Sequence, residues 1–202
     1  MLRILLLIAV VALFGCRAGE PPAPTQPPAP PPAAETPAEA KPEPAPEGEK
    51  VSVNLETQKG AIELELDPTA APKAVANFVK LVKDGFYDGM PFHRVEPGFV
   101  IQAGDPSLVN RPPAGYTIPD EKSPIKHVRG TIAMARVYRG GQMVPNSAST
   151  QFYICLGDAP HLDQMGFTAF GRIVKGLEVI DKIAVGDKIV KASVIEKSGG
   201  PA

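Results

Sequence analysis

A segment without a single large apolar side chain separates the start of this chain from the rest of it. Residues 17–50 comprise 34 residues, of which 12 are Pro, 8 Ala and 6 Glu, and none is Val, Ile, Leu, Met, Phe, Trp or Tyr. Such a segment has nothing with which to build a core, and its prolines favour extended polyproline II. It is therefore predicted to be a semi-rigid, solvated tether that reaches about 100 Å, with a ligand for a proline-binding module as the alternative.

The residues before this tether have the pattern of an export signal. An apolar run of 11 residues, Ile4 to Phe14, follows the basic Arg3. The run is too short for a membrane-spanning helix of about 20 residues but is typical of a signal-peptide core. It ends in Leu13-Phe14-Gly15-Cys16, which resembles the bacterial lipobox, in which the cysteine is acylated and becomes the new amino terminus. Cleavage and release without a lipid is the alternative.

These two segments predict the organisation of the chain and its location. Residues 1–15 are expected to be a lipoprotein signal peptide, residues 16–50 a lipidated cysteine with its tether, and residues 51–199 the globular domain. The domain is expected in the bacterial cell envelope, anchored to the membrane through Cys16 and facing the periplasm or the exterior.

Charge and motif content exclude several classes of function. The formal net charge is −1 with both signs interspersed, so no basic cluster favours nucleic acid. The sequence has neither a phosphate-binding loop nor a dinucleotide fingerprint, and its three histidines lie more than 30 residues apart, so no local spacing predicts a metal site. Cys155 lies in an apolar run and is expected to be a buried, unpaired thiol rather than a nucleophile.

Beyond residue 50 the apolar pattern is mainly that of β-strands. Apolar residues alternate with polar ones on both sides of a turn at 57–60, which predicts a β-hairpin: Val51, Val53, Leu55, Ile62, Leu64 and Leu66. Helical spacing follows at Val75, Phe78, Val79 and Val82, and a second short helix is expected around residues 179–183. Further strands are expected at 99–102, 131–135, 151–156, 168–174 and 191–197. Such a pattern favours an antiparallel barrel or sandwich.

Five blocks of this region together resemble the cyclophilin family of peptidyl-prolyl isomerases. They are FHRVEPGFVIQAGDP (92–106), TIAMAR (131–136), NSASTQFYI (146–154), LD (162–163) and FTAFG (167–171). The resemblance covers roughly residues 51–198, nearly all of the predicted domain. It implies an all-β fold, an eight-stranded antiparallel closed β-barrel capped by two α-helices. It also implies catalysis of rotation about the bond that precedes proline.

The resemblance assigns catalytic roles to Arg94, Phe99 and Gln102. It implies that Arg94 reaches the proline carbonyl and donates to the prolyl nitrogen as the amide twists, while Gln102 hydrogen-bonds the substrate backbone. Phe99 would form an apolar pocket for the proline ring with Met134, Tyr153 and Leu162. The substrate-binding residues implied in this way are His93, Met134, Ala135, Arg136, Gln151, Tyr153, Leu162 and Phe167. No nucleophile, metal or cofactor is required.

Some positions depart from the family pattern. Tyr153 stands where phenylalanine is usual, so its hydroxyl needs water or a protein group as a hydrogen-bond partner. The stretch 137–144 looks like a short insertion.

The expected function is a peptidyl-prolyl isomerase that acts as a monomer on proline-containing peptides and on unfolded or exported proteins, assisting their folding outside the cytoplasm. The alternative is a proline-peptide-binding or chaperone module with incidental catalysis.

Overall fold

The computed structural model describes residues 48–195. The predicted signal peptide, Cys16 and nearly all of the predicted tether lie outside the described residues. Within 48–195 no helix is long and apolar enough to cross a bilayer.

The predicted hairpin is present and begins the main sheet. Strands β1 (Val51–Thr57) and β2 (Gly60–Leu66) pair antiparallel from Val51↔Leu66 to Thr57↔Gly60. Val53, Leu55, Ile62, Leu64 and Leu66 are fully buried, as the alternation predicts, because every second side chain of a strand points to the same face.

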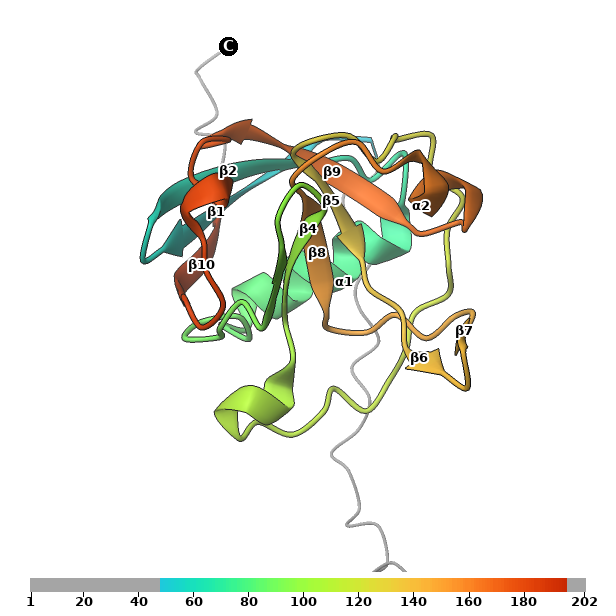
Figure 1. Cartoon of the computed structure of the whole chain (residues 1–202), viewed down its shortest axis with the longest axis horizontal. Helices are drawn as coiled ribbons and strands as arrows, with labels where there is room; N and C mark the ends of the chain where they lie inside the picture. Colours follow the sequence, from blue (N-terminus) through green and yellow to red (C-terminus); the bar gives the residue numbers. More distant parts are fainter. Residues whose placement is uncertain (1–47, 196–202) are drawn as a thin grey trace, which may run out of the picture. The chain divides into compact units, whose positions relative to one another are not determined.

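Eight antiparallel strands form one curled sheet (Figure 1). Their order is β10-β1-β2-β9-β5-β8-β4-β3, and a separate hairpin is made of β6 and β7. The remaining strands are β3 (Arg94–Glu96), β4 (Val100–Ala103), β5 (Thr131–Met134), β6 (Tyr138–Arg139), β7 (Gln142–Met143), β8 (Phe152–Cys155), β9 (Ala169–Lys175) and β10 (Ile189–Ile195). The predicted mainly-β, eight-stranded antiparallel fold is confirmed.

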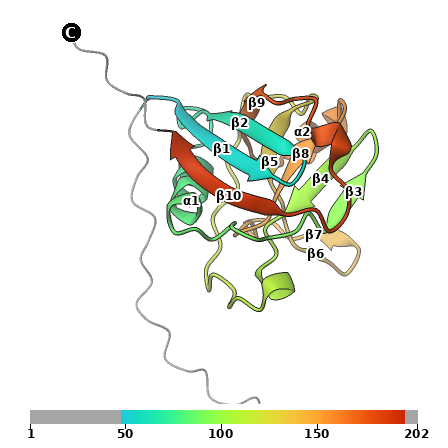
Figure 2. The ribbon, with the colours of Figure 1, turned by 90° about the vertical axis from the view of Figure 1, so that its left-hand side faces the viewer.

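The closure of the barrel is only partial. No ladder joins the edge strands β3 and β10 within the described residues; instead, the segments that lead into them meet, as Figure 2 shows where the start of β10 approaches β3. An isolated bridge pairs Pro91 with Lys188, and the Phe92 amide donates to the Asp187 carbonyl at 2.8 Å. The predicted closed barrel is therefore an incompletely closed one.

Two α-helices accompany the sheet, but only one lies where the apolar spacing predicted it. Helix α1 (Pro72–Lys83) is the predicted amphipathic helix, and its C-cap residue, Asp84, directly precedes Gly85. The predicted second helix is wrong in position: residues 180–182 form a single 3-10 turn, η2 (Ile180–Lys182). The second α-helix is α2 (Pro160–Gln164), and another 3-10 turn, η1 (Pro106–Val109), follows β4.

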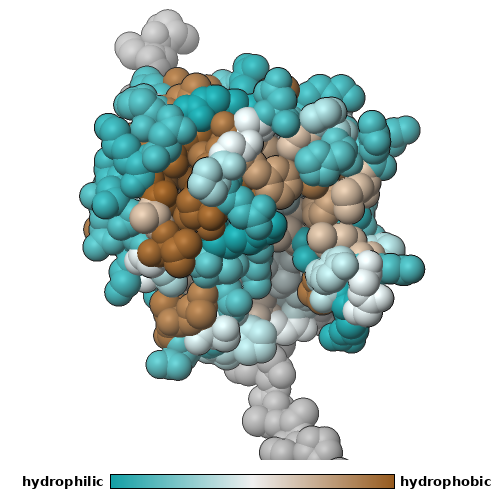
Figure 3. All heavy atoms as spheres, in the orientation of Figure 1, coloured by the Kyte–Doolittle hydropathy of each residue, from teal (hydrophilic) through white to brown (hydrophobic). Residues whose placement is uncertain are grey.

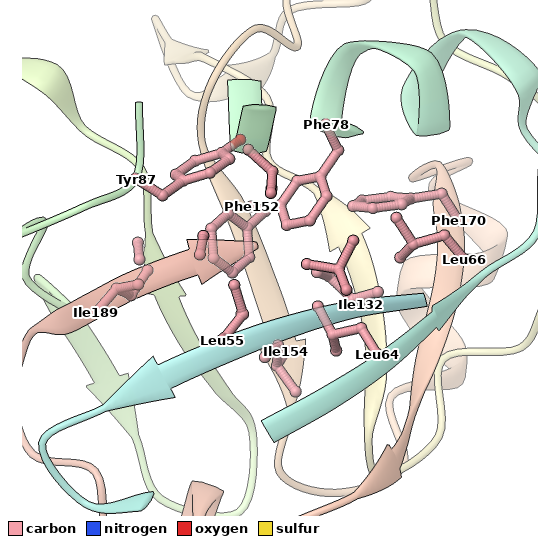
Figure 4. Packing of buried hydrophobic residues seen from close by; sticks show 14 of the residues in the cluster. Leu55, Leu64, Leu66, Phe78, Tyr87, Ile132, Phe152, Ile154, Phe170 and Ile189 are labelled. Carbon is pink, nitrogen blue, oxygen red and sulfur yellow. The ribbon is translucent and has the colours of Figure 1, made fainter. Parts of the chain in front are cut away.

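The main core lies between the concave face of the sheet and α1. Phe78 of α1 stands at its centre, with ring centroids 5.1 Å from Tyr87, 5.2 Å from Phe152 and 5.3 Å from Phe170 (Figure 4). A second, smaller apolar cluster lies on the other face of β5 and β8 and includes Tyr153 and Leu162. Because β5 and β8 are buried on both faces, they carry one cluster on each side.

Candidate active site

A groove of about 390 Å³ opens beside the second apolar cluster. It is bounded by β3 and β4, by α2 and by the β6–β7 hairpin, and Figure 1 shows α2 and this hairpin on the same side of the domain. The lining residues are Arg94, Phe99, Val100, Gln102, Ala135, Arg136, Tyr138, Met143, Tyr153, His161, Leu162, Met165 and Phe167. The fold thus brings together most of the residues that the cyclophilin resemblance implied.

Strand alternation decides which side chains face this groove. On β8, Tyr153 belongs to the groove-side cluster while its neighbours Phe152 and Ile154 belong to the main core. On β5 and just beyond it, Ala133 and Ala135 face the groove side, so Met134 points the other way. Met134 is 1% exposed and lies in the main core, so the implied pocket role of Met134 is corrected to a core role.

Two strands place the polar end of the groove. The β3–β4 register pairs Arg94 with Gln102, which brings their side chains together. Arg94 Nε donates to Glu96 Oε1 at 2.8 Å, and Arg94 Nη1 donates to Gln102 Oε1 at 3.3 Å. Arg94 Nη2 lies 2.6 Å from the same Glu96 oxygen. Since a guanidinium has five N–H donors, this arrangement orients Arg94 and leaves donors for a substrate.

Gln102 is itself held by a second amide. Gln102 Nε2 donates to Gln151 Oε1 at 2.8 Å, which fixes the orientation of the Gln102 side chain. Gln151 is not among the residues that line the groove, and its substrate-binding role stays a prediction. Arg94 also lies over the Phe99 ring, with 5.8 Å from its guanidinium carbon to the ring centroid. Polar and apolar parts of the groove therefore meet at Arg94.

The apolar floor of the groove is built from aromatic rings and one leucine. Tyr153 and Phe167 pack edge to face with centroids 5.9 Å apart, and Leu162 of α2 belongs to the same cluster. Phe99 is stacked on His161 at 5.4 Å. The floor is a concave, mostly apolar surface next to a few polar groups, the usual form of a binding site for a small apolar group.

The Tyr153 hydroxyl has the partner that a buried hydroxyl requires. It lies 2.9 Å from His127 Nε2, and His127 Nδ1 lies 2.7 Å from Asp163 Oδ1. Burial raises the pKa of Tyr153, so the group is a neutral phenol within hydrogen-bond distance of His127. Burial alone would raise the pKa of Asp163, but hydrogen bonds from His127 outweigh it and hold this pKa below its usual value. Sequence reasoning missed His127; the unexplained tyrosine hydroxyl was the signal for it.

Arg136 forms part of the wall through its side chain. Its Nε donates to Asp120 Oδ1 at 2.9 Å, its guanidinium carbon lies 4.8 Å from the Phe167 ring centroid, and its Nη groups donate to the carbonyls of Met165 and Gly166. The side chain is thereby fixed against α2. The substrate-binding role implied for Arg136 stays a prediction.

His93 does not line the groove, although it precedes Arg94. Burial lowers its pKa; nearby Asp105 opposes this shift, and Arg94 adds to it. Its Nδ1 is buried without a hydrogen-bond partner among the described residues. The substrate-binding role of His93 is thus a prediction that the groove geometry does not support. Conversely, the groove includes residues to which sequence reasoning gave no role: Val100, Tyr138, Met143, His161 and Met165.

Cys155 is expected to be chemically inert in the folded protein. Its side chain is fully buried, and burial, with smaller effects of Asp163 and Asp158, raises the pKa of its thiol to about 12. In a Cys16→Ser protein at pH 8, alkylation of Cys155 by iodoacetamide should be more than about a thousandfold slower in buffer than in denaturant, because the thiolate is the reactive form. Complete labelling of the folded protein within minutes would contradict this burial.

Comparisons with known proteins agree with the geometry. The model of the family "Cyclophilin type peptidyl-prolyl cis-trans isomerase/CLD" matches residues 52–199. A peptidyl-prolyl cis-trans isomerase of Synechococcus elongatus is 42% identical over 143 residues, covering 70% of this chain and 94% of the relative. One of Helicobacter pylori is 44% identical over 148 residues, covering 71% of this chain and 86% of the relative.

Solved structures show the same fold. A cyclophilin-type peptidyl-prolyl cis-trans isomerase of Cryptosporidium parvum superposes with a TM-score of 0.65 at 27% identity, covering 74% of this chain and 99% of that one. A crystal structure of the same protein in the presence of the dipeptide Ala-Pro has a TM-score of 0.63 at 27% identity, covering 72% of this chain and 99% of that one. The chain therefore belongs to the cyclophilin family and is a peptidyl-prolyl cis-trans isomerase.

Proposed function

We propose that the groove holds the proline ring of an extended peptide on its apolar floor while Arg94 stabilises the twisted amide. The observation that carries this proposal is the position of Arg94, oriented by Glu96 and Gln102 at the edge of that floor. Rotation about a peptide bond costs about 18–20 kcal/mol because amide resonance is lost. In the twisted state the prolyl nitrogen recovers its lone pair and accepts a hydrogen bond that the planar amide does not accept.

The rate acceleration that such a site has to provide is moderate. Uncatalysed prolyl isomerisation takes tens of seconds, so exchange in milliseconds requires a rate increase of about ten-thousandfold, or about 5.5 kcal/mol of differential transition-state binding. A single donor aimed at charge that develops in the transition state contributes about 3–4 kcal/mol in other enzymes. Arg94, together with a peptide held by Gln102 and the floor, is sufficient for this chemistry without a nucleophile or cofactor.

The substrate class proposed is proline-containing peptide in an extended or unfolded chain. The Ala-Pro dipeptide named with the similar Cryptosporidium structure supports this class. The test is NMR exchange spectroscopy of an Ala-Pro-Phe peptide with the purified full-length protein at catalytic concentration. Exchange between the cis and trans resonances within milliseconds to seconds is expected. No exchange, with peptide binding detected by shift changes, would instead favour a binding or chaperone module.

The proposed place of action is outside the cytoplasm. The export-like run 4–14, Cys16 and the proline-rich tether support a monomeric isomerase held at the bacterial cell envelope, where it assists the folding of exported proteins.

Acylation of Cys16 is tested by metabolic labelling with a radioactive fatty acid in a bacterial host. The wild-type protein is expected to incorporate label and to sediment with membranes, whereas the Cys16→Ser protein incorporates none. Cys155→Ser is the matched control and should label like the wild type, because Cys155 is buried in the fold. Label in neither the wild type nor Cys155→Ser would exclude the lipid anchor and leave simple secretion.

A further inference from the structure

The β6–β7 hairpin projects from a rigidly held base at one end of the groove. Asp120 accepts from Arg136 Nε and from the Asn146 amide, both at 2.9 Å, and so clamps the chain on either side of the hairpin. The Val144 amide donates to the Val137 carbonyl at 2.9 Å and closes the hairpin itself. The clamp and this backbone bond fix the direction in which the hairpin points.

The turn of this hairpin sets which side chains share a face. Gly140 and Gly141 both have positive φ, 60° and 83°, which is the backbone of the tight two-residue turn that joins twisted strands. The turn aligns Tyr138 opposite Met143, so these two large side chains lie next to each other on one face. That face is turned to the groove, because both residues line it.

The rim so formed is apolar and largely uncovered. Tyr138 is 65% exposed and Met165, at the end of α2, is 48% exposed, while Met143 packs against the cluster that contains Tyr153 and Leu162. We call Tyr138, Met143 and Met165 the apolar rim. The polar groups Arg94 and Gln102 belong to other strands of the groove, β3 and β4. Exposed side chains of this size, continuous with a binding groove, are typical of a surface that a ligand covers.

We propose that the apolar rim is a second subsite, which takes a bulky apolar side chain next to the isomerised proline. This inference rests on the proposed function, because the occupant is part of the same peptide. Met143 of the rim packs against the floor cluster, and neighbouring residues of an extended chain are only about 3.3–3.6 Å apart along it, so the rim lies next to the residues that flank a proline held on the floor. Methionine side chains adapt to ligands of different shape, so the subsite selects for apolar bulk rather than for one residue type. The preferred substrates are prolines in hydrophobic segments, which unfolded chains expose and folded proteins bury.

The test compares kcat/KM for peptides in which the residue before or after proline is Leu or Glu, with NMR exchange as the readout. For the full-length wild type, Leu at one of the two flanking positions is expected to exceed Glu by about five- to tenfold, as for other small apolar contacts in binding sites. In the Tyr138→Ser/Met143→Ser protein, this Leu/Glu ratio is expected to fall to about 1.

The matched control is Val185→Ser. Figure 1 shows β10 on the opposite side of the domain from the hairpin, where Figure 3 shows an apolar surface. Val185 belongs to the segment before β10, is also 65% exposed and does not line the groove. It should keep the wild-type ratio. If the wild type shows no preference for Leu, or if the double variant keeps that preference, the proposed subsite is wrong. Turnover of Ala-Pro-Phe by the same proteins would still support the isomerase function. A wild type that turns over no peptide would overturn the proposed function and the subsite with it.

Discussion

Arg94→Ala is expected to lower kcat/KM for Ala-Pro-Phe by about a hundredfold or more, the usual effect of removing a donor aimed at transition-state charge. The loss should appear in kcat more than in KM, because the planar amide of the ground state does not use this hydrogen bond. Arg94→Lys is expected to recover only a small part, since an ammonium lacks the planar fork that Glu96 and Gln102 hold in place. NMR exchange with each purified variant measures the effect.

The control for this variant is Arg172→Ala. Arg172 is an exposed arginine of β9 that lies 3.4 Å from Glu65 and is not among the residues that line the groove. Its replacement should leave turnover unchanged, and both variants should melt within a few degrees of the wild type, because both side chains lie at the surface. Wild-type turnover by a folded Arg94→Ala protein would remove Arg94 from the mechanism. Retained peptide binding without turnover is the expected phenotype.

Two phenylalanines of this domain are expected to respond to truncation in opposite ways. Phe78 is fully buried and makes ring contacts with Tyr87, Phe152 and Phe170 at the centre of the main core (Figure 4). Phe78→Ala should therefore lower the free energy of unfolding by about 3–5 kcal/mol through lost burial and the cavity left behind. Urea denaturation followed by circular dichroism measures this change.

Phe99→Ala is the matched comparison in the groove. Phe99 is partly exposed and packs on His161 and beneath Arg94, outside the main core. Its truncation should cost less than about 1.5 kcal/mol of stability, because its burial is incomplete. It should nevertheless lower kcat/KM about tenfold, since it removes part of the floor that holds proline. Equal destabilisation by the two variants would contradict the assignment of Phe78 to the core and Phe99 to the groove.

The periodicity of the sequence determined those elements that bury only one face and that form from residues close together in the chain. The hairpin of β1 and β2 follows from strict alternation between Val51 and Leu66, and α1 follows from the spacing of its apolar residues. The family resemblance determined the fold class and the identity of the polar pair Arg94 and Gln102. Each of these inferences depends on residues close together in the chain or on a pattern specific to one family.

Short elements and doubly buried strands were decided by the tertiary structure. Helix α2 has only five residues, too few to show a period. Val179, Ile180 and Ile183 imitate a helix because all three are buried in one 3-10 turn and the residues directly before and after it. Every residue of β5 and β8 is buried, so no alternation in the sequence tells which face Met134 or Tyr153 occupies.

The composition of the groove is likewise a tertiary property. His127 meets Tyr153 across 26 residues of sequence, and Asp163 meets His127 across 36, through contacts that only the curled sheet creates. The stretch 137–144 appeared in the sequence as an insertion; its clamped base and two-glycine turn place Tyr138 and Met143 beside a floor supplied by β8 and α2. Local pattern therefore determined which chemistry the chain carries, and packing between distant segments decided which side chains surround it.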